Sequence, residues 1–146
     1  MKKTPTLTIT STDLETLGKI LFEAKEYYRK LYQIEAYENL NYLSQISEAY
    51  LKYFHLDLIR SNIENRLLKG KYTHQYMLSQ TDCFYLLSSI LPTNNLTYYA
   101  KVKTTVLEYC VTVLKYYGLI CENATFKTAL PNLTLPKIHT NEFEIL

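Results

Sequence analysis

Residues that interrupt regular structure are scarce in this chain, and they lie far apart. The 146 residues include only three glycines and four prolines. Between Pro5 and Pro92 there is no further proline, and the only glycines are Gly18 and Gly70. Glycine and proline are the residues that most often mark turns, and a chain with few turns is usually helical. Their scarcity therefore predicts an all-α fold.

The first predicted helix follows a short alternating segment near the N-terminus. Thr12 and Glu15 have the spacing of a capping box, in which the threonine oxygen and the glutamate satisfy free backbone N–H groups. Downstream of this cap, apolar residues recur at alternating steps of three and four, which places them on one helical face: Leu14, Leu17, Leu21, Ala24, Tyr28 and Leu31.

A second helix is predicted to begin at Asn39 or Asn41 and to end at Gly70, where glycine can adopt the left-handed conformation of a helix terminus. Such a helix is long for a globular protein, so a break near residues 55–57 is an open alternative. Its predicted apolar stripe is Leu40, Leu43, Ile46, Tyr50, Leu51, Phe54, Leu58, Ile63 and Leu67.

A third helix is predicted over residues 73–91, ending before Pro92 because proline disfavours a helical conformation of the preceding residue. The segment "SQTD", residues 79–82, is an alternative helix start, because serine is a preferred capping residue. In that case residues 72–80 would form a separate short element. The residues expected to face inward are Tyr76, Cys83, Phe84, Leu87 and Leu91.

A fourth helix is predicted from a cap at Asn94 or Asn95 to Tyr117, followed by Gly118. Its β-branched residues also suit strands, but the length of the segment and its flanking residues favour a helix. If residues 98–117 or the C-terminal tail formed strands, the fold would be α+β. The inward residues are expected to be Tyr99, Val102, Val106, Cys110, Val113 and Tyr117.

Both ends of the chain are predicted to be extended. Leu7 and Ile9 alternate with threonines, which is typical of a strand or an extended arm over residues 1–11. Residues 119–146 are predicted to form an extended tail, since prolines within them exclude a long helix. The sequence thus predicts a single domain, residues 1–146, in which residues 12–118 form a four- to five-helix bundle.

Composition and charge limit which classes of partner and which cellular compartment we expect. The net charge of +2 is too small to indicate nucleic-acid binding by itself. No run is long enough to span a membrane, and no apolar leader segment is evident near the N-terminus. The three cysteines are an odd number without close pairs, which favours a reducing compartment. We therefore expect a cytoplasmic protein that does not act at a membrane.

No catalytic, cofactor or metal site is predicted. His55, His74 and His139 have no acidic or cysteine neighbour at a metal-ligand spacing. The isolated glycines form neither a P-loop nor a Rossmann loop, so nucleotides bound in either of these ways are not expected. For the three cysteines, the sequence supplies neither the base nor the oxyanion donor that a nucleophile would need. The chain is therefore not predicted to be an enzyme.

Tyrosine is concentrated in residues 26–54, which contain seven of the fifteen tyrosines. Tyr28 and Tyr50 fall on the apolar stripes, whereas Tyr27, Tyr32 and Tyr53 fall beside them. A tyrosine at such a boundary can bury its ring and keep its hydroxyl in water, and tyrosine is also enriched at protein interfaces. We therefore expect a small non-catalytic interaction module, a regulator, inhibitor or assembly subunit, that binds another protein or itself through these three tyrosines.

The alternative function is nucleic-acid binding by residues 60–76, where positive and aromatic side chains alternate as a nucleic-acid strand would require. The same cations also suit the end of a helix. In addition, Asp57 and Glu64 lie within helical reach of Arg60. The candidate residues are Arg60, Arg66, Lys69, Lys71, Tyr72 and His74.

Overall fold

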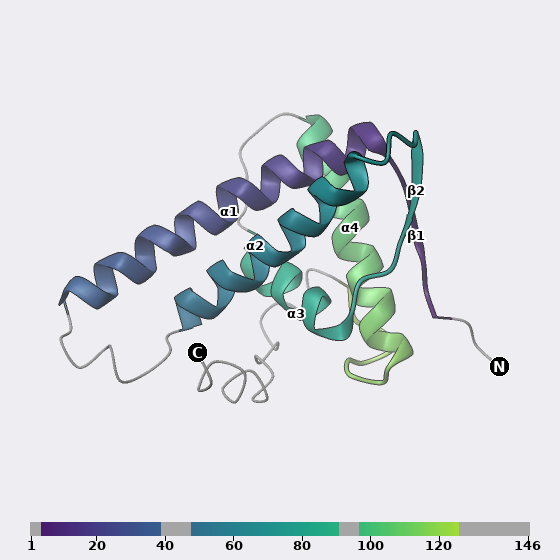
Figure 1. The fold of residues 1–146 in the computed structure, drawn as a ribbon. Coiled ribbons are helices and arrows are strands. Elements are labelled where there is room, and N and C mark those ends of the chain that lie inside the picture. Colours follow the sequence, from purple (N-terminus) through teal and green to yellow (C-terminus); the bar gives the residue numbers. More distant parts are fainter. Residues whose placement is uncertain (1–3, 39–47, 91–96, 126–146) are drawn as a thin grey trace.

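Four helices and one two-stranded sheet make up the part of the chain that the computed structural model describes, residues 4–38, 48–90 and 97–125. The protein is therefore mostly helical, as predicted, with a small sheet in addition (Figure 1). In chain order the elements are β1 (Leu7–Thr10), α1 (Ser11–Glu38), α2 (Glu48–Leu67), β2 (Thr73–Tyr76), α3 (Gln80–Ser89) and α4 (Thr97–Tyr116).

The consecutive helices α1 and α2 lie side by side and run in opposite directions (Figure 1). The predicted stripe of α1 is confirmed, because its residues from Leu14 to Tyr28 are buried in the core. Full burial of one such apolar side chain contributes about 1.5–3 kcal/mol. The far end of this helical pair extends past α4, which packs against α3 and beside the first part of α1 (Figure 1).

The buried face of α2 differs from the predicted one. Leu58, expected inside, is 51% exposed, whereas Leu56 and Ile59 are buried. The reason is that α2 packs against α1 on one side and α3 on the other, so that His55 also falls within the buried arc. No break occurs near residues 55–57, because α2 is continuous. The predicted start of this helix lies outside the described residues.

The strand β2 replaces the predicted first turn of the third helix. Residues 73–76 pair antiparallel with β1, Leu7 opposite Tyr76 and Thr10 opposite Thr73. The prediction of a helix from residue 73 was wrong because the partner that makes this segment a strand is distant in sequence. The alternative start at "SQTD" is confirmed, since the Asp82 N–H donates to the Ser79 Oγ at 3.1 Å and α3 begins at Gln80.

The N-terminus of α1 is capped two residues earlier than predicted. The Asp13 N–H donates to the Thr10 Oγ1 at 3.1 Å, so Thr10 and not Thr12 is the cap. Strand β1 therefore leads directly into α1. The predicted N-terminal arm is extended, but its residues 7–10 are paired in the sheet.

The predicted fourth helix is confirmed as α4, with Val102, Val106, Cys110 and Val113 buried, whereas Tyr117 follows the helix and is exposed. Gly70 after α2 has a φ of +70°, the left-handed conformation that the sequence predicted for it, and Gly118 after α4 has the same φ. The predicted cap at residues 94–95 and the tail from residue 126 onward lie outside the described residues.

Candidate interaction surface along the outer seam of α1 and α2

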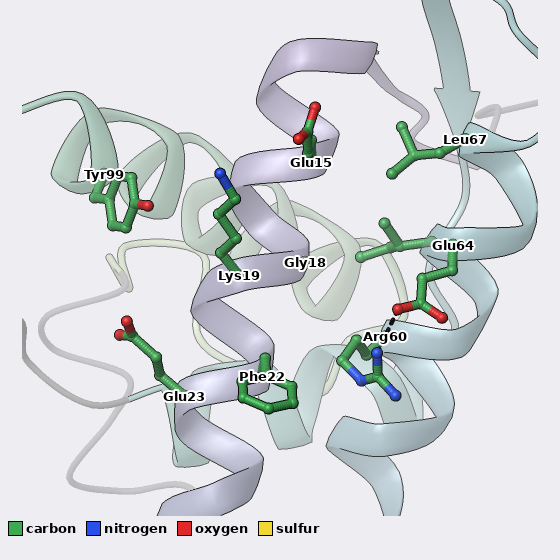
Figure 2. Close-up of a pocket in the computed structure, with 10 residues that line it drawn as sticks. Glu15, Gly18, Lys19, Phe22, Glu23, Arg60, Glu64, Leu67 and Tyr99 are labelled. Carbon is green, nitrogen blue, oxygen red and sulfur yellow. Dashed lines mark hydrogen bonds and ion pairs between the residues drawn. The ribbon is translucent and has the colours of Figure 1, made fainter.

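A furrow of about 400 Å³ lies on the solvent side of the α1–α2 pair, near the N-terminus of α1 (Figure 2). Apolar groups form its base and charged groups its rims. Its lining residues are Glu15, Gly18, Lys19, Phe22, Glu23, Arg60, Ile63, Glu64, Leu67 and Tyr99.

The base of the furrow is open because Gly18 has no side chain. A Cβ built at this position would lie 3.7 Å from the Ile63 Cγ2, an ordinary van der Waals distance. The space above Gly18 is therefore bounded by the neighbours Phe22 and Leu67 rather than by residue 18 itself (Figure 2).

Replacing Gly18 by alanine is expected to raise the free energy of unfolding by about 0.4–1 kcal/mol, because the methyl group fits and alanine favours the helix. Urea denaturation monitored by circular dichroism measures the change. The matched control is Gly70→Ala, which should destabilise the protein, since the φ of Gly70 is +70°. A loss of stability in Gly18→Ala would show that the two helices approach each other more closely than described.

A network of ion pairs continues from the furrow along the same side of the α1–α2 pair. The Arg60 guanidinium lies 3.3 Å from the Asp57 carboxylate and pairs with Glu64 as well, as their helical spacing predicted. The Lys25 ammonium lies 3.3 Å from Asp57 and thereby joins α1 to α2. Both cations are therefore paired with carboxylates on this side of the helical pair.

The ring of Phe22 lies near both of these cations and is exposed to solvent. Its centroid is 5.0 Å from the Lys25 Nζ and 5.8 Å from the Arg60 Cζ, within the range of cation–π attraction. The residue is nevertheless 49% exposed. The structure thus places an exposed aromatic ring beside two paired cations on this surface.

Two of the three tyrosines predicted to form an interface lie further along the same side of the α1–α2 pair. Tyr53 lies 6.0 Å from the Lys25 Nζ, and its ring centroid is 6.3 Å from that of Tyr50. Tyr50 in turn contacts Tyr32 across the helical pair, with 5.0 Å between centroids. Tyr32 and Tyr53 are half-buried. We call the strip from Glu15 and Leu67 to Tyr32 and Tyr50 the outer seam.

Tyr27 lies apart from the outer seam. It is five residues from Tyr32 in α1, and this spacing places the two side chains on different helical faces. Its exposed ring packs edge-on against buried Tyr28, with 5.0 Å between centroids. The three predicted interface tyrosines therefore do not form one cluster.

The middle of the outer seam carries a carboxylate with a perturbed pKa. The Arg29 guanidinium donates two hydrogen bonds to the Glu26 Oε2, at 2.6 and 2.8 Å. These bonds hold the pKa of Glu26 below its ordinary value. Glu26 therefore stays ionised at neutral pH and holds Arg29 on the rim of the seam.

Two of the residues predicted to bind nucleic acid make contacts inside the fold. Arg66 donates to the Gln75 carbonyl at 3.1 Å, and its guanidinium lies 4.5 Å from the ring centroid of Tyr76. His74 is buried, with its Nε2 at 2.8 Å from the Ser11 Oγ. Arg66 and His74 thus attach β2 to the helices.

The Ser11–His74 contact has the spacing of a serine nucleophile and its base. However, the Ser11 hydroxyl donates to the Lys71 carbonyl, so the same oxygen accepts the hydrogen bond from the His74 Nε2–H. In this arrangement the imidazole is a donor and not a base. The Ser11–His74 contact therefore fastens the start of α1 to β2, and the Ser11–Lys71 bond fastens it to the segment before β2.

The other four predicted nucleic-acid residues are in two different environments. Lys69, Lys71 and Tyr72 are exposed on the turn after α2, Tyr72 by 74%, next to Leu68, which is 84% exposed. Arg60 belongs to the outer seam. The structure therefore brings only Lys69, Lys71 and Tyr72 together on an accessible surface.

Replacing Arg66 by alanine is expected to lower the free energy of unfolding by about 1–2 kcal/mol, since a charged hydrogen bond and a cation–π contact are lost. Chemical denaturation measures the loss. Lys69→Ala is the control, because Lys69 is exposed and a surface change of this kind stays within about 0.5 kcal/mol. Equal effects of the two substitutions would contradict the assigned role of Arg66.

Sequence reasoning missed Gly18, Phe22 and Tyr99 as site residues. The lining residues of α1 and of α2 recur three and four positions apart, and this spacing can be read from the sequence. That the two sets face the same furrow follows only from the contact between the helices.

Over residues 4–38, 48–90 and 97–125 the structure contains no group of three His, Cys, Asp or Glu side chains able to hold a metal ion. None of the helices described is long and apolar enough to cross a membrane.

Comparisons of the chain with protein-family models, with curated proteins and with solved structures found no match. The arguments for function therefore come from the outer seam itself.

Proposed function

We propose that this protein is a non-catalytic protein–protein interaction module, a helical bundle that binds its partner through the outer seam. The observation that carries the proposal is the exposed Phe22 ring, which two paired cations hold at the edge of a furrow of about 400 Å³. Half-buried Tyr53 and Tyr32 continue the surface. Aromatic and arginine side chains in such settings dominate binding energies at protein interfaces.

The shape of the surface favours a macromolecular partner. The outer seam extends well beyond the furrow, as a long strip with charged rims, whereas a site for a small molecule usually buries most of its ligand in one pocket. An interface with a polar rim around aromatic anchors is typical of proteins that bind proteins. We assign the protein to the cytoplasm as part of the same proposal, on the basis of its odd number of cysteines.

Site-specific photo-crosslinking tests the proposed surface. A photoreactive phenylalanine analogue at position 22 should crosslink a discrete protein in the source cells. The same analogue at position 58 should not, although Phe22 and Leu58 are 49% and 51% exposed, respectively. The captured protein is then purified and titrated with the wild-type chain and with Phe22→Ala, which should weaken binding at least about tenfold. Equal crosslinking from both positions, or equal affinity of the two chains, would reject the outer seam.

Nucleic-acid binding is the second candidate function, supported by the exposure of Lys69, Lys71 and Tyr72 on one turn. Lysine can pair with phosphates and tyrosine can stack on a base. Fluorescence anisotropy with single-stranded RNA and duplex DNA, at about 50 and 200 mM salt, tests it, because phosphate contacts weaken steeply with salt. Binding at low salt that Lys69→Ala and Lys71→Ala abolish would favour this candidate, and no binding at low salt would exclude it.

A further inference from the structure

Four of the five residues that α1 contributes to the furrow are spaced as a packing hole. Glu15, Gly18, Lys19 and Phe22 occupy positions i, i+3, i+4 and i+7. In helix–helix packing, one side chain of a neighbouring helix inserts into a hole made by four residues of the facing helix. The glycine deepens this hole, because three side chains surround an empty position.

The second helix contributes the same pattern to the opposite wall. Arg60, Ile63, Glu64 and Leu67 also occupy positions i, i+3, i+4 and i+7, and all four line the furrow. Two packing holes on adjacent antiparallel helices therefore open into one furrow (Figure 2). Each hole extends over seven residue steps, a length of about 10 Å along its helix.

A helix is the element whose side chains match both holes. A helix laid along the furrow presents side chains three and four residues apart, the period with which the two walls are built. An extended peptide instead gains affinity by adding to an exposed strand edge. The furrow walls are helices, whose interior backbone groups are bonded within each helix, so they provide no such edge.

Charge on the rim favours a basic partner. Arg60 is already paired with Asp57 and Glu64. On the α1 rim, Glu15, Lys19 and Glu23 have no ion pair with any residue that the structure describes, and this group has an excess of one negative charge. A lysine or arginine on the partner can thus pair with Glu15 or Glu23 without competing with an existing contact.

We propose that the furrow binds an amphipathic helix of a partner protein, with an apolar stripe that enters the two holes and with lysine or arginine beside that stripe. This inference rests on the proposed function and specifies the class of partner. Phe22 and Leu67 contact the apolar stripe, and Gly18 leaves room for one of its larger side chains.

Two synthetic helices provide the test. Both are 21-residue amphipathic peptides with leucines at the apolar positions, and they differ only in having lysines or glutamates beside the leucines. Each is checked by sedimentation to be monomeric. Labelled with a fluorophore and titrated with the full chain, the lysine peptide should bind at least about tenfold more tightly than the glutamate peptide. Exchanging Glu15 and Glu23 for lysine should reverse this order.

Variants of the chain locate the binding. Gly18→Leu fills the base of the furrow and Phe22→Ala removes its edge, so each should weaken binding of the lysine peptide at least about tenfold. Leu58→Ala, which changes an equally exposed apolar side chain on another face of α2, should leave it unchanged. Circular dichroism and urea denaturation check that each variant folds. If Gly18→Leu does not fold, Phe22→Ala and the charge exchange decide the question.

Three results would overturn the inference. One is failure of the lysine peptide to bind, and another is binding that survives both Gly18→Leu and Phe22→Ala. The third is a dimer of the wild-type chain, seen by sedimentation, that Gly18→Leu dissociates, since the furrow would then hold a second copy. If position 22 crosslinks a partner while the peptides do not bind, the proposed function stands and only the helical partner is rejected.

Discussion

Leu56→Ala is expected to lower the free energy of unfolding by about 2–5 kcal/mol, because it opens a cavity in the packed core. Leu56 has no exposed surface and lies on α2, which packs against both α1 and α3. Leu58→Ala, two residues away, should change stability by no more than about 0.5 kcal/mol, since Leu58 is 51% exposed. Urea denaturation followed by circular dichroism measures both values.

The two substitutions delete the same side chain from the same helix, so helix propensity cancels between them. The difference between their losses in free energy of unfolding therefore depends on which side of α2 faces the core. Comparable losses for Leu56 and Leu58 would show that α2 is rotated about its axis relative to the structure. The outer seam would then have a different set of lining residues, so this comparison also tests the basis of the proposed function.

Tyr109→Phe is expected to lower the free energy of unfolding by about 1–3 kcal/mol, although only one oxygen atom is removed. The Tyr109 hydroxyl donates to the Pro5 carbonyl at 3.0 Å and accepts from the Leu78 N–H at 3.2 Å. The pKa of Tyr109 is raised, mainly by burial, so the hydroxyl remains protonated and able to donate at neutral pH. Its loss leaves a buried N–H group without an acceptor.

Thermal and urea denaturation of Tyr109→Phe measure the loss, and hydrogen exchange locates it. Exchange should accelerate at β1 and at Leu78, the segments that the hydroxyl connects to α4. Tyr117→Phe is the control, because Tyr117 is exposed beyond the end of α4. Unchanged stability and exchange in Tyr109→Phe would mean that water replaces the hydroxyl without cost.

Sequence periodicity was sufficient to predict the buried residues of a helix that buries a single face. The stripe of α1 from Leu14 to Tyr28 and that of α4 from Val102 to Val113 are both confirmed, because each follows the helical repeat. Periodicity failed for α2, where neighbours on two sides bury His55 and Leu56 and leave Leu58 outside. A sequence pattern does not state how many neighbours a helix has.

Contacts between distant residues account for the other errors. Residues 73–76 form a strand because β1 is their partner, and His74 is buried because it bonds to Ser11, 63 residues away. The candidate site was predictable only in part. The tyrosines near the seam were identified from their position beside an apolar stripe, but Gly18, Phe22 and Tyr99 become a site only when α1, α2 and α4 are brought together.

The pairing of β1 with β2 has a consequence for the order of folding. The two strands flank the α1–α2 pair in the chain, so their antiparallel ladder can form only after a loop of more than sixty residues closes. The entropy lost in closing that loop is not recovered by four residue pairs alone. We therefore expect the helices to associate first and the strands to pair last, so that local unfolding of the native protein begins at the N-terminal strand.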